Sequence, residues 1–337
     1  MMNCFLLQTT SAQILSSNAS HFLKRLSPNE GLSQSKVNKT LQDAQGFIWI
    51  ATDMGLNRYD GYQVKFIDGP NGVFSTETIT TLFIDRQHNL WVSTLSSGLF
   101  KIDTSTLVIE HIFDGRLTAD KSVISEVVSI AQGESDLLWL AISNQVYSLN
   151  TQNGKLLHYL SLDRKDNFVR ALYKEDDWLF CATANGLYRL NTITKENLFI
   201  PHQATSIKHS EASNNTKFLI KDDKMGLLMG TVEGLFQLQN TDQQSIKQVS
   251  VKLIVPHLNI WDAVLHQNNY VIASDKGLFS LNRDTLTLTQ LLKFSDSRYQ
   301  ITDDSILDLF EDNSGNLWLS SKSQGVMIWS PKTLRFN

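Results

Sequence analysis

The chain repeats itself, and this repetition restricts its fold more than any other feature of the sequence. The stretch Ile48–Asp60, which contains Ile-Trp-Ile-Ala-Thr and then Gly-Leu, returns in closely similar form at Leu90–Asp103 and more loosely in later copies. Aligned on the glycine position, the motif occurs seven times in 337 residues, at intervals of 41 to 48 residues. The seven copies are centred on Gly55, Gly98, Gln145, Gly186, Gly234, Gly277 and Gly325.

Each copy is predicted to form four short β-strands. An alternating apolar strand such as 79–84 is followed by an Asp/Asn/Gly turn, a Trp-bearing strand, a Gly-Leu strand and a more polar strand such as 286–292. Runs of this composition between turns are typical of strands, and no window has a sustained helical period. Four strands in a repeat of about 40–50 residues are typical of a β-propeller. The sequence therefore predicts an all-β fold, a seven-bladed β-propeller with four antiparallel strands per blade.

The recurrent large residue of the second strand is expected to fill the gap between neighbouring blades, because an aromatic side chain buries a large apolar area. The glycine of the third strand permits a tight backbone with positive φ. The large residue is Trp in four copies and another apolar residue in the rest: Trp49, Trp91, Trp139, Phe180, Leu228, Val271 and Trp318.

The predicted domain boundaries follow from where the repeats begin and end. Residues 1–20 are interpreted as a leader or a clipped signal peptide, and 21–337 as one propeller. Two alternatives for closing the ring stay open. Residues 21–26 form a strand that completes or flanks the seventh blade, or residues 333–336 continue that blade into a further domain.

Composition and motifs exclude several kinds of function. Hydrophobic residues make up 42% and charged residues 19%, which supports a packed core, and the net charge of −4 provides no basic field for nucleic acid. Cys4 and Cys181 match no metal or redox spacing, and the eight histidines never fall at metal-ligand spacing. No phosphate loop or hydrolase motif occurs. We therefore predict no catalytic residue, no metal and no cofactor in this chain.

The most favourable binding surface of a propeller is the mouth of its central channel, where the innermost strands begin. Alignment of the seven first strands places dissimilar residues at one equivalent position, with the third uncertain by one residue. Variation in a regular repeat favours a site built onto a scaffold, although a ring that simply faces channel water stays an alternative. A cation there suits an anionic ligand, and an indole suits stacking on a sugar. The equivalent residues are Asn38, Thr80, Glu126, Arg170, Lys217, Trp261 and Leu307, and all but the last are candidate ligand-binding residues.

The first copy also resembles a known family. The runs Gly31–Val37, Gln42-Asp43, Gly46–Thr52 and Gly55–Gly61 resemble the two-component regulator propeller repeat. Copies two and seven match that repeat well, and copies three to six match it in outline. The resemblance extends over roughly residues 21–337. In that family, such repeats form the extracytoplasmic sensor region of bacterial hybrid histidine kinases and of some membrane diguanylate cyclases.

The resemblance implies a non-catalytic, extracytoplasmic (periplasmic) ligand-sensing input domain. Its expected partners are a small-molecule ligand, with an oligosaccharide as the candidate, downstream signalling domains in a longer protein, and a second copy in a homodimer. Two alternatives stay open: a propeller enzyme of the hydrolase or lyase type, and a scaffold that binds another protein.

Overall fold

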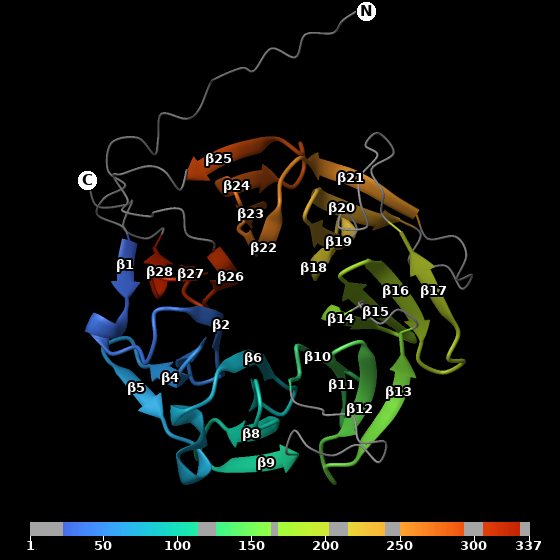
Figure 1. The fold of residues 1–337 in the computed structure, drawn as a ribbon. Coiled ribbons are helices and arrows are strands. Elements are labelled where there is room, and N and C mark those ends of the chain that lie inside the picture. Colours follow the sequence, from blue (N-terminus) through green and yellow to red (C-terminus); the bar gives the residue numbers. More distant parts are fainter. Residues whose placement is uncertain are drawn as a thin grey trace, which may run out of the picture.

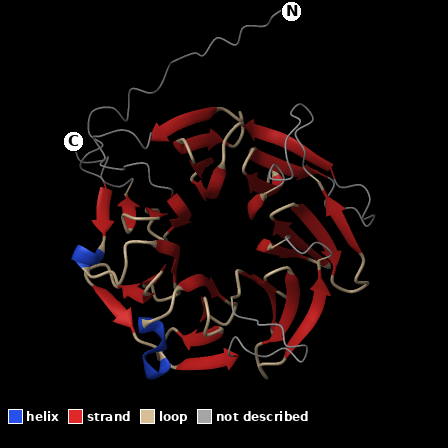
Figure 2. Ribbon diagram, in the orientation of Figure 1, coloured by secondary structure: helices blue, strands red, loops and turns tan. Residues whose placement is uncertain are grey.

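The computed structural model describes residues 23–113, 126–162, 168–201, 215–239, 250–292 and 306–330. Within these residues, seven four-stranded antiparallel sheets surround a central channel, one sheet per blade (Figure 1). The only helices in the same residues are two 3₁₀ segments, η2 (Pro28–Glu30) and η3 (Pro70–Ser75), so strands dominate the ribbon (Figure 2). The predicted seven-bladed, all-β architecture is confirmed.

The blades follow one another in chain order, and in each blade the strands run from the channel outward. Blades one to three contain β2 (Val37–Gln42), β3 (Ile48–Thr52), β4 (Gly55–Tyr59), β5 (Val64–Ile67); β6 (Ile79–Ile84), β7 (Asn89–Thr94), β8 (Leu99–Asp103), β9 (Ile109–Phe113); and β10 (Ser129–Gln132), β11 (Leu137–Ile142), β12 (Gln145–Asn150), β13 (Leu156–Ser161). Blades four to six contain β14 (Val169–Glu175), β15 (Trp178–Thr183), β16 (Gly186–Asn191), β17 (Asn197–Ile200); β18 (Thr216–Asp222), β19 (Gly226–Thr231), β20 (Gly234–Gln239), β21 (Ser250–Pro256); and β22 (Ile260–His266), β23 (Asn269–Ser274), β24 (Gly277–Asn282), β25 (Leu288–Leu292).

The seventh blade is assembled from both ends of the described chain. Its inner strands are β26 (Ile306–Glu311), β27 (Leu317–Ser321) and β28 (Val326–Trp329), and its outermost strand is β1 (Leu23–Leu26), antiparallel to β28. Of the two alternatives for this edge, the structure therefore has the N-terminal strand in place, while residues 333–336 lie outside the described residues.

The core lies between the blades rather than within one sheet. In one cluster, Trp49 and Ala51 of the first blade pack with Leu82 and Leu90 of the second. All five residues of β3 are buried, which explains why the second strand of each repeat is almost wholly apolar. The large residue of this strand fills the space between blades, as its recurrence predicts.

The indole N–H of this Trp has a fixed partner in three blades. In each case it donates to the Asp six residues earlier, which opens the turn between the first and second strands. These Asp residues are predicted from the sequence only to form turns, and in the structure they also anchor the buried Trp to the turn. The pairs are Trp49 with Asp43 at 2.7 Å, Trp91 with Asp85 at 2.8 Å, and Trp318 with Asp312 at 2.9 Å.

The recurrent glycine is required by both its backbone and its surroundings. Gly55 has φ of +106°, and a Cβ at this position would lie 2.4 Å from the Phe66 ring. The preceding Thr52 closes the same turn, because its hydroxyl donates to the Gly55 carbonyl at 2.9 Å and accepts the Met54 N–H at 3.1 Å. The Thr-x-x-Gly spacing therefore encodes a tight turn on the face of the ring where the innermost strands begin.

Candidate functional site

The innermost strands share an irregularity at the face of the ring where they begin, which we call the channel mouth. In the first blade, Val37 pairs with Thr52 and Lys39 pairs with Ala51, so Asn38 lies between them as a β-bulge. A bulge bends the strand and redirects a side chain, and bulges recur beside functional sites. The same irregularity occurs in six blades, at Asn38, Thr80, Arg170, Lys217, Trp261 and Leu307. These are positions that the sequence alignment made equivalent.

The third blade departs from that alignment. Val127 is fully buried, like the residue before each bulge, and the N–H of Val128 donates to the Ala141 carbonyl at 2.9 Å. Val128 therefore holds the equivalent place, two residues beyond Glu126, and the predicted alignment is wrong at this blade. The reason is Gly133, which replaces the turn-opening Asp of the better-matched copies and removes the residue on which the alignment depends.

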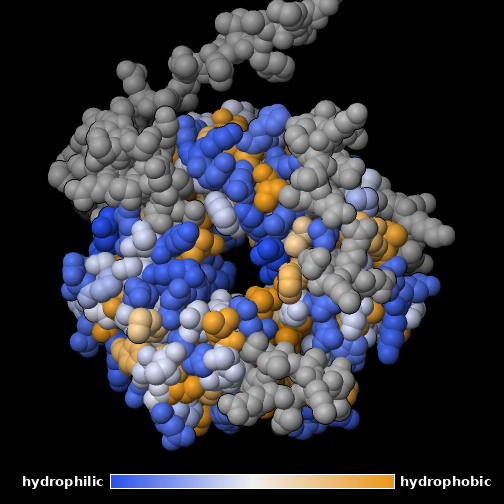
Figure 3. Space-filling model, viewed as in Figure 1, coloured by the Kyte–Doolittle hydropathy of each residue, from blue (hydrophilic) through white to orange (hydrophobic). Residues whose placement is uncertain are grey.

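Four of the six candidate residues nevertheless line one cavity at the channel mouth. The cavity has a volume of about 770 Å³ and is bordered by blades three to six, whose inner strands β10, β14, β18 and β22 follow one another around the channel (Figure 1). The opening of the channel is visible in the space-filling view (Figure 3). The lining residues are Glu126, Val128, Phe168, Val169, Arg170, Asn215, Lys217, Val232, Asn259 and Trp261.

The other two candidate residues are engaged in the fold. The Asn38 side-chain amide donates to the Asp53 carboxylate at 2.9 Å and to the Ile79 carbonyl at 2.9 Å, and so ties the first blade to the second. The Thr80 hydroxyl donates to the Ser93 carbonyl at 3.4 Å. The structure does not bring Asn38 or Thr80 into the cavity with the other four.

Lys217 is held against Trp261. Its Nζ lies 3.2 Å from the centroid of the indole ring and donates to Asn259 Oδ1 at 2.5 Å. Burial, and then the positive charge of Arg170, lower the pKa of Lys217 to about 8, against a partial opposing effect of Asp275. One face of the Trp261 ring is thus covered by an ammonium group, so that face is not open for stacking on a sugar.

Arg170 and Glu126 face the cavity without partners in the described part of the chain. Arg170 is exposed, and Glu126 is half-buried. Burial raises the pKa of the Glu126 carboxyl, and no neighbouring charge offsets that effect. The Trp261 Nε1 atom is buried and finds no hydrogen-bond acceptor among the described residues. The cavity therefore holds uncommitted groups of both charges.

A second ionisable cluster lies on the channel wall and has a structural role. The Asp308 carboxylate forms an ion pair with Lys39 Nζ at 2.5 Å and accepts a hydrogen bond from the Thr40 N–H at 2.9 Å. Both partners belong to the next blade. Asp262 likewise accepts the Leu309 N–H of its next blade at 2.8 Å. These carboxylates join successive inner strands, so we assign them to the ring and not to a ligand.

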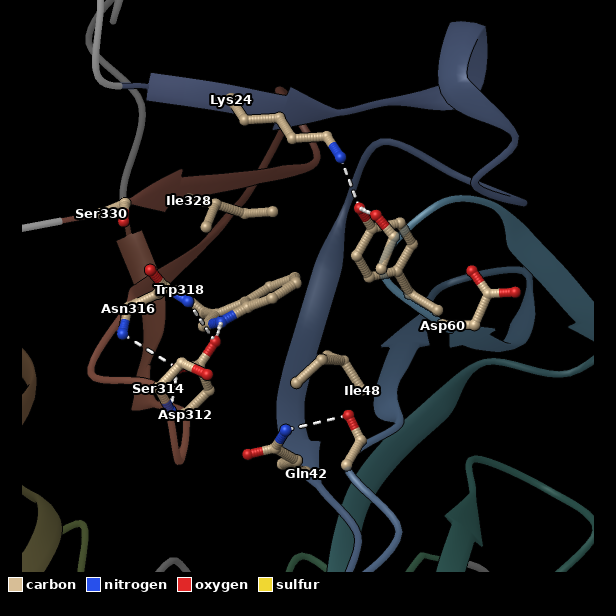
Figure 4. Close-up of a pocket in the computed structure, with 13 residues that line it drawn as sticks. Lys24, Gln42, Ile48, Asp60, Asp312, Ser314, Asn316, Trp318, Ile328 and Ser330 are labelled. Atoms are coloured by element: carbon tan, nitrogen blue, oxygen red, sulfur yellow. Dashed lines mark hydrogen bonds between the residues drawn. The ribbon is translucent and has the colours of Figure 1, made fainter. Parts of the chain in front are cut away.

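A smaller cavity of about 440 Å³ lies at the junction of the seventh and first blades (Figure 4). Lys24 donates to the Tyr59 hydroxyl across it. Asp312 accepts from the Asn316 amide at 2.8 Å and from the Trp318 indole at 2.9 Å. The polar groups of this cavity largely hydrogen-bond to one another across the junction, in contrast to those at the channel mouth.

Among the described residues, no group of three or more His, Cys, Asp or Glu side chains is arranged to hold a metal ion. In the same residues no helix has the length and apolar character needed to cross a bilayer. Cys181 is a buried free thiol, and burial raises its pKa.

Comparisons with known proteins bear on the repeat and the fold. A family profile described as "Two component regulator propeller" matches residues 300–323, which confirms the resemblance seen in the repeats. Among curated proteins, no sequence matches this chain.

Solved structures share the propeller. The extracellular domain of the putative one component system BT4673 from B. thetaiotaomicron is 23% identical, with a TM-score of 0.71 over 92% of this chain and 40% of that chain. The extracellular domain of the putative hybrid two component system BT3049 from B. thetaiotaomicron is 19% identical, with a TM-score of 0.74 over 92% and 42%. This chain thus spans about two fifths of those solved chains. Virginiamycin B lyase from Staphylococcus aureus is 12% identical, with a TM-score of 0.70 over 91% and 98%. At such identities the likeness is one of fold.

Proposed function

We propose that this chain is an extracytoplasmic sensing domain that binds a small soluble ligand at the channel mouth and does not transform it. The observation that carries the proposal is the cavity in which Glu126, Arg170, Lys217 and Trp261 meet. Three of them (Arg170, Lys217 and Trp261) occupy the bulge position, whose residue differs between blades although the scaffold repeats. The side chains of Glu126 and Arg170 are uncommitted in the described residues. Convergent polar groups in a concave pocket are the usual mark of a ligand site.

The comparisons support the sensing part of the proposal. The matched repeat is described by its role in two-component regulators, and two similar solved chains are extracellular domains of putative signalling systems. Because those chains are longer than this one, we propose that the propeller acts within a larger signalling protein, which carries the output. An oligosaccharide stays a candidate ligand through the family resemblance.

A propeller enzyme is the second candidate, because Glu126 offers a carboxyl with a raised pKa in the cavity that Arg170 and Lys217 also line, and a lyase has the same fold. A general acid or base needs such a group. Turnover therefore separates the two proposals. A sensor returns its ligand unchanged, whereas a lyase or hydrolase converts it.

The test is a thermal-shift screen of oligosaccharides, uronic acids and peptides, followed by calorimetry and by mass spectrometry of the recovered ligand. A ligand that binds only the native state raises the Tm by mass action. We expect Arg170→Ala and Trp261→Ala to weaken binding of each hit by about tenfold or more, which is about 1.4 kcal/mol, while circular dichroism stays unchanged. Lys36→Gln is the control, because Lys36 lies at the mouth of the first blade, outside the cavity.

If the protein converts a ligand found in the screen, the enzyme proposal replaces the sensor proposal. Hits that bind both cavity variants as tightly as the parent protein would move the site away from the channel mouth.

A further inference from the structure

The two cations of the channel-mouth cavity form no ion pair among the described residues, in contrast to Lys36 elsewhere on the same face. Lys36 Nζ of the first blade lies 3.0 Å from the Asp53 carboxylate. Arg170 and Lys217 form no ion pair with any described residue, although they repel each other across the cavity. Lys217 is half-buried, and Asp275 offsets only part of the effect of its burial and of the exposed Arg170, so a negative charge between the two cations would be stabilised. In a chain with a net charge of −4, this local excess is a specific feature of the cavity.

Lys217 is held in position by neutral partners that leave it a free donor. One N–H of the ammonium group reaches Asn259 Oδ1 at 2.5 Å, and the group lies over the Trp261 ring. Asn259 is itself fixed, because its N–H donates to the Asp275 carboxylate at 3.1 Å. An ammonium group has three donors, so one remains for a ligand. Arg170 adds a planar donor fork that matches a carboxylate.

The opposite end of the cavity has the opposite charge. Glu126 comes from the third blade, on the far side of Arg170 from Lys217, and no described residue donates a hydrogen bond to it. A carboxylate accepts from hydroxyl or ammonium groups. Val128 and Val169 add apolar side chains to the lining of the same cavity. Around the mouth, the order is thus acid, cation, cation and aromatic ring.

We propose that the ligand is a small acid that also bears hydroxyl or ammonium groups. Its anionic group lies between Arg170 and Lys217, and its donors face Glu126. The proposal rests on the channel mouth being the ligand site, and it adds the charge, the donors and the orientation of the ligand.

Three small probes separate the contributions: D-glucuronate has both the acid and the hydroxyl donors, D-glucuronamide lacks the charge, and acetate lacks the hydroxyls. We expect D-glucuronate to bind the full chain about tenfold or more tightly than either of the others, by calorimetry at probe concentrations up to about 10 mM. Arg170→Gln and Lys217→Met are expected to remove the preference over D-glucuronamide. Glu126→Leu is expected to remove the preference over acetate, and Lys36→Gln is expected to change neither.

The outcomes distinguish this inference from the proposed function. If D-glucuronamide binds as tightly as D-glucuronate and Trp261→Ala abolishes both, the channel mouth is a ligand site but the charge assignment is overturned. Preferences that survive in the Arg170, Lys217 and Glu126 variants overturn the assignment of residues. Absence of D-glucuronate binding at about 10 mM also overturns the inference, because paired charge-assisted hydrogen bonds should hold this probe at millimolar concentration. The wider ligand screen tests the site itself.

Discussion

Asp262 and Asp308 project from neighbouring inner strands and act on the same lysine. The Lys39 ammonium pairs with Asp308, and its charge also acts on Asp262. Burial, reinforced by the negative charge of Asp308, raises the pKa of Asp262 to about 7, and Lys39 offsets only part of this effect. At the scale of single residues, burial leaves the Asp262 carboxyl partly protonated near neutral pH, and in the same position it accepts the Leu309 N–H of the next blade.

The first prediction concerns the pH dependence contributed by Asp262. Its pKa is about 7 in the folded chain and about 3.9 when unfolded, so between these values the folded chain binds more protons. The free energy of unfolding should then fall as pH rises from about 4 to 7, by at most about 1.4 kcal/mol per pH unit from this group. Denaturant titrations should show that Asp262→Asn removes this fall, relative to the parent chain. Asp60→Asn, in an exposed turn, should leave it in place, and an unchanged slope in Asp262→Asn would contradict the assignment.

At the scale of single elements, repetition made the strands predictable, and interruptions of the repeat made the rest unpredictable. The bulge positions of six blades could be aligned because each lies five residues before the turn-opening residue. In the third blade, Gly133 occupies the turn-opening position, so the sequence alignment selects Glu126 although Val128 holds the equivalent place. The contact between Lys217 and the Trp261 ring could not be predicted either, because it joins different blades and depends on side-chain packing. By contrast, the Trp–Asp contact had a visible signal, an Asp six residues before Trp in three copies.

The second prediction compares two tryptophans on different strands of a blade. Trp49 lies on a second strand, is fully buried and donates to Asp43, so Trp49→Ala should cost about 3–5 kcal/mol of unfolding free energy. Trp261 lies at a bulge on a first strand and lines the cavity, so Trp261→Ala should cost far less. Chemical denaturation of both variants is the measurement. Similar losses at the two positions would mean that Trp261 belongs to the core.

At the scale of the whole molecule, the ring depends on its junction between the seventh and first blades. Inner strands are joined there by Lys39 and Thr40 with Asp308, and the Thr40 and Ser320 hydroxyls lie 2.8 Å apart. At the rim, β28 pairs on its outer side with β1, and the described residues give it no other backbone partner there. The sequence can indicate an additional strand at 21–26. Which strand it pairs with depends on which blade becomes the neighbour of the first blade when the ring closes. That closure is a property of packing, not of any one repeat.

The last prediction tests this closure by truncation. Deletion of residues 1–26 removes β1, its four-residue pairing with β28, and the Leu26 side chain, which is 2% exposed and packs with Val37 and Trp318. Loss of a buried Leu alone costs about 2–5 kcal/mol, so the Tm should fall by about 5 °C or more. The exposed edge of β28 should also promote concentration-dependent aggregation, because an unpaired strand is a template for further pairing.

Deletion of residues 1–18 keeps β1 and should leave the Tm unchanged, while Leu26→Ala in the full chain should reproduce part of the loss without the aggregation. Scanning calorimetry and light scattering measure both effects. Equal stability of the two truncations would mean that the inner-strand contacts close the ring on their own.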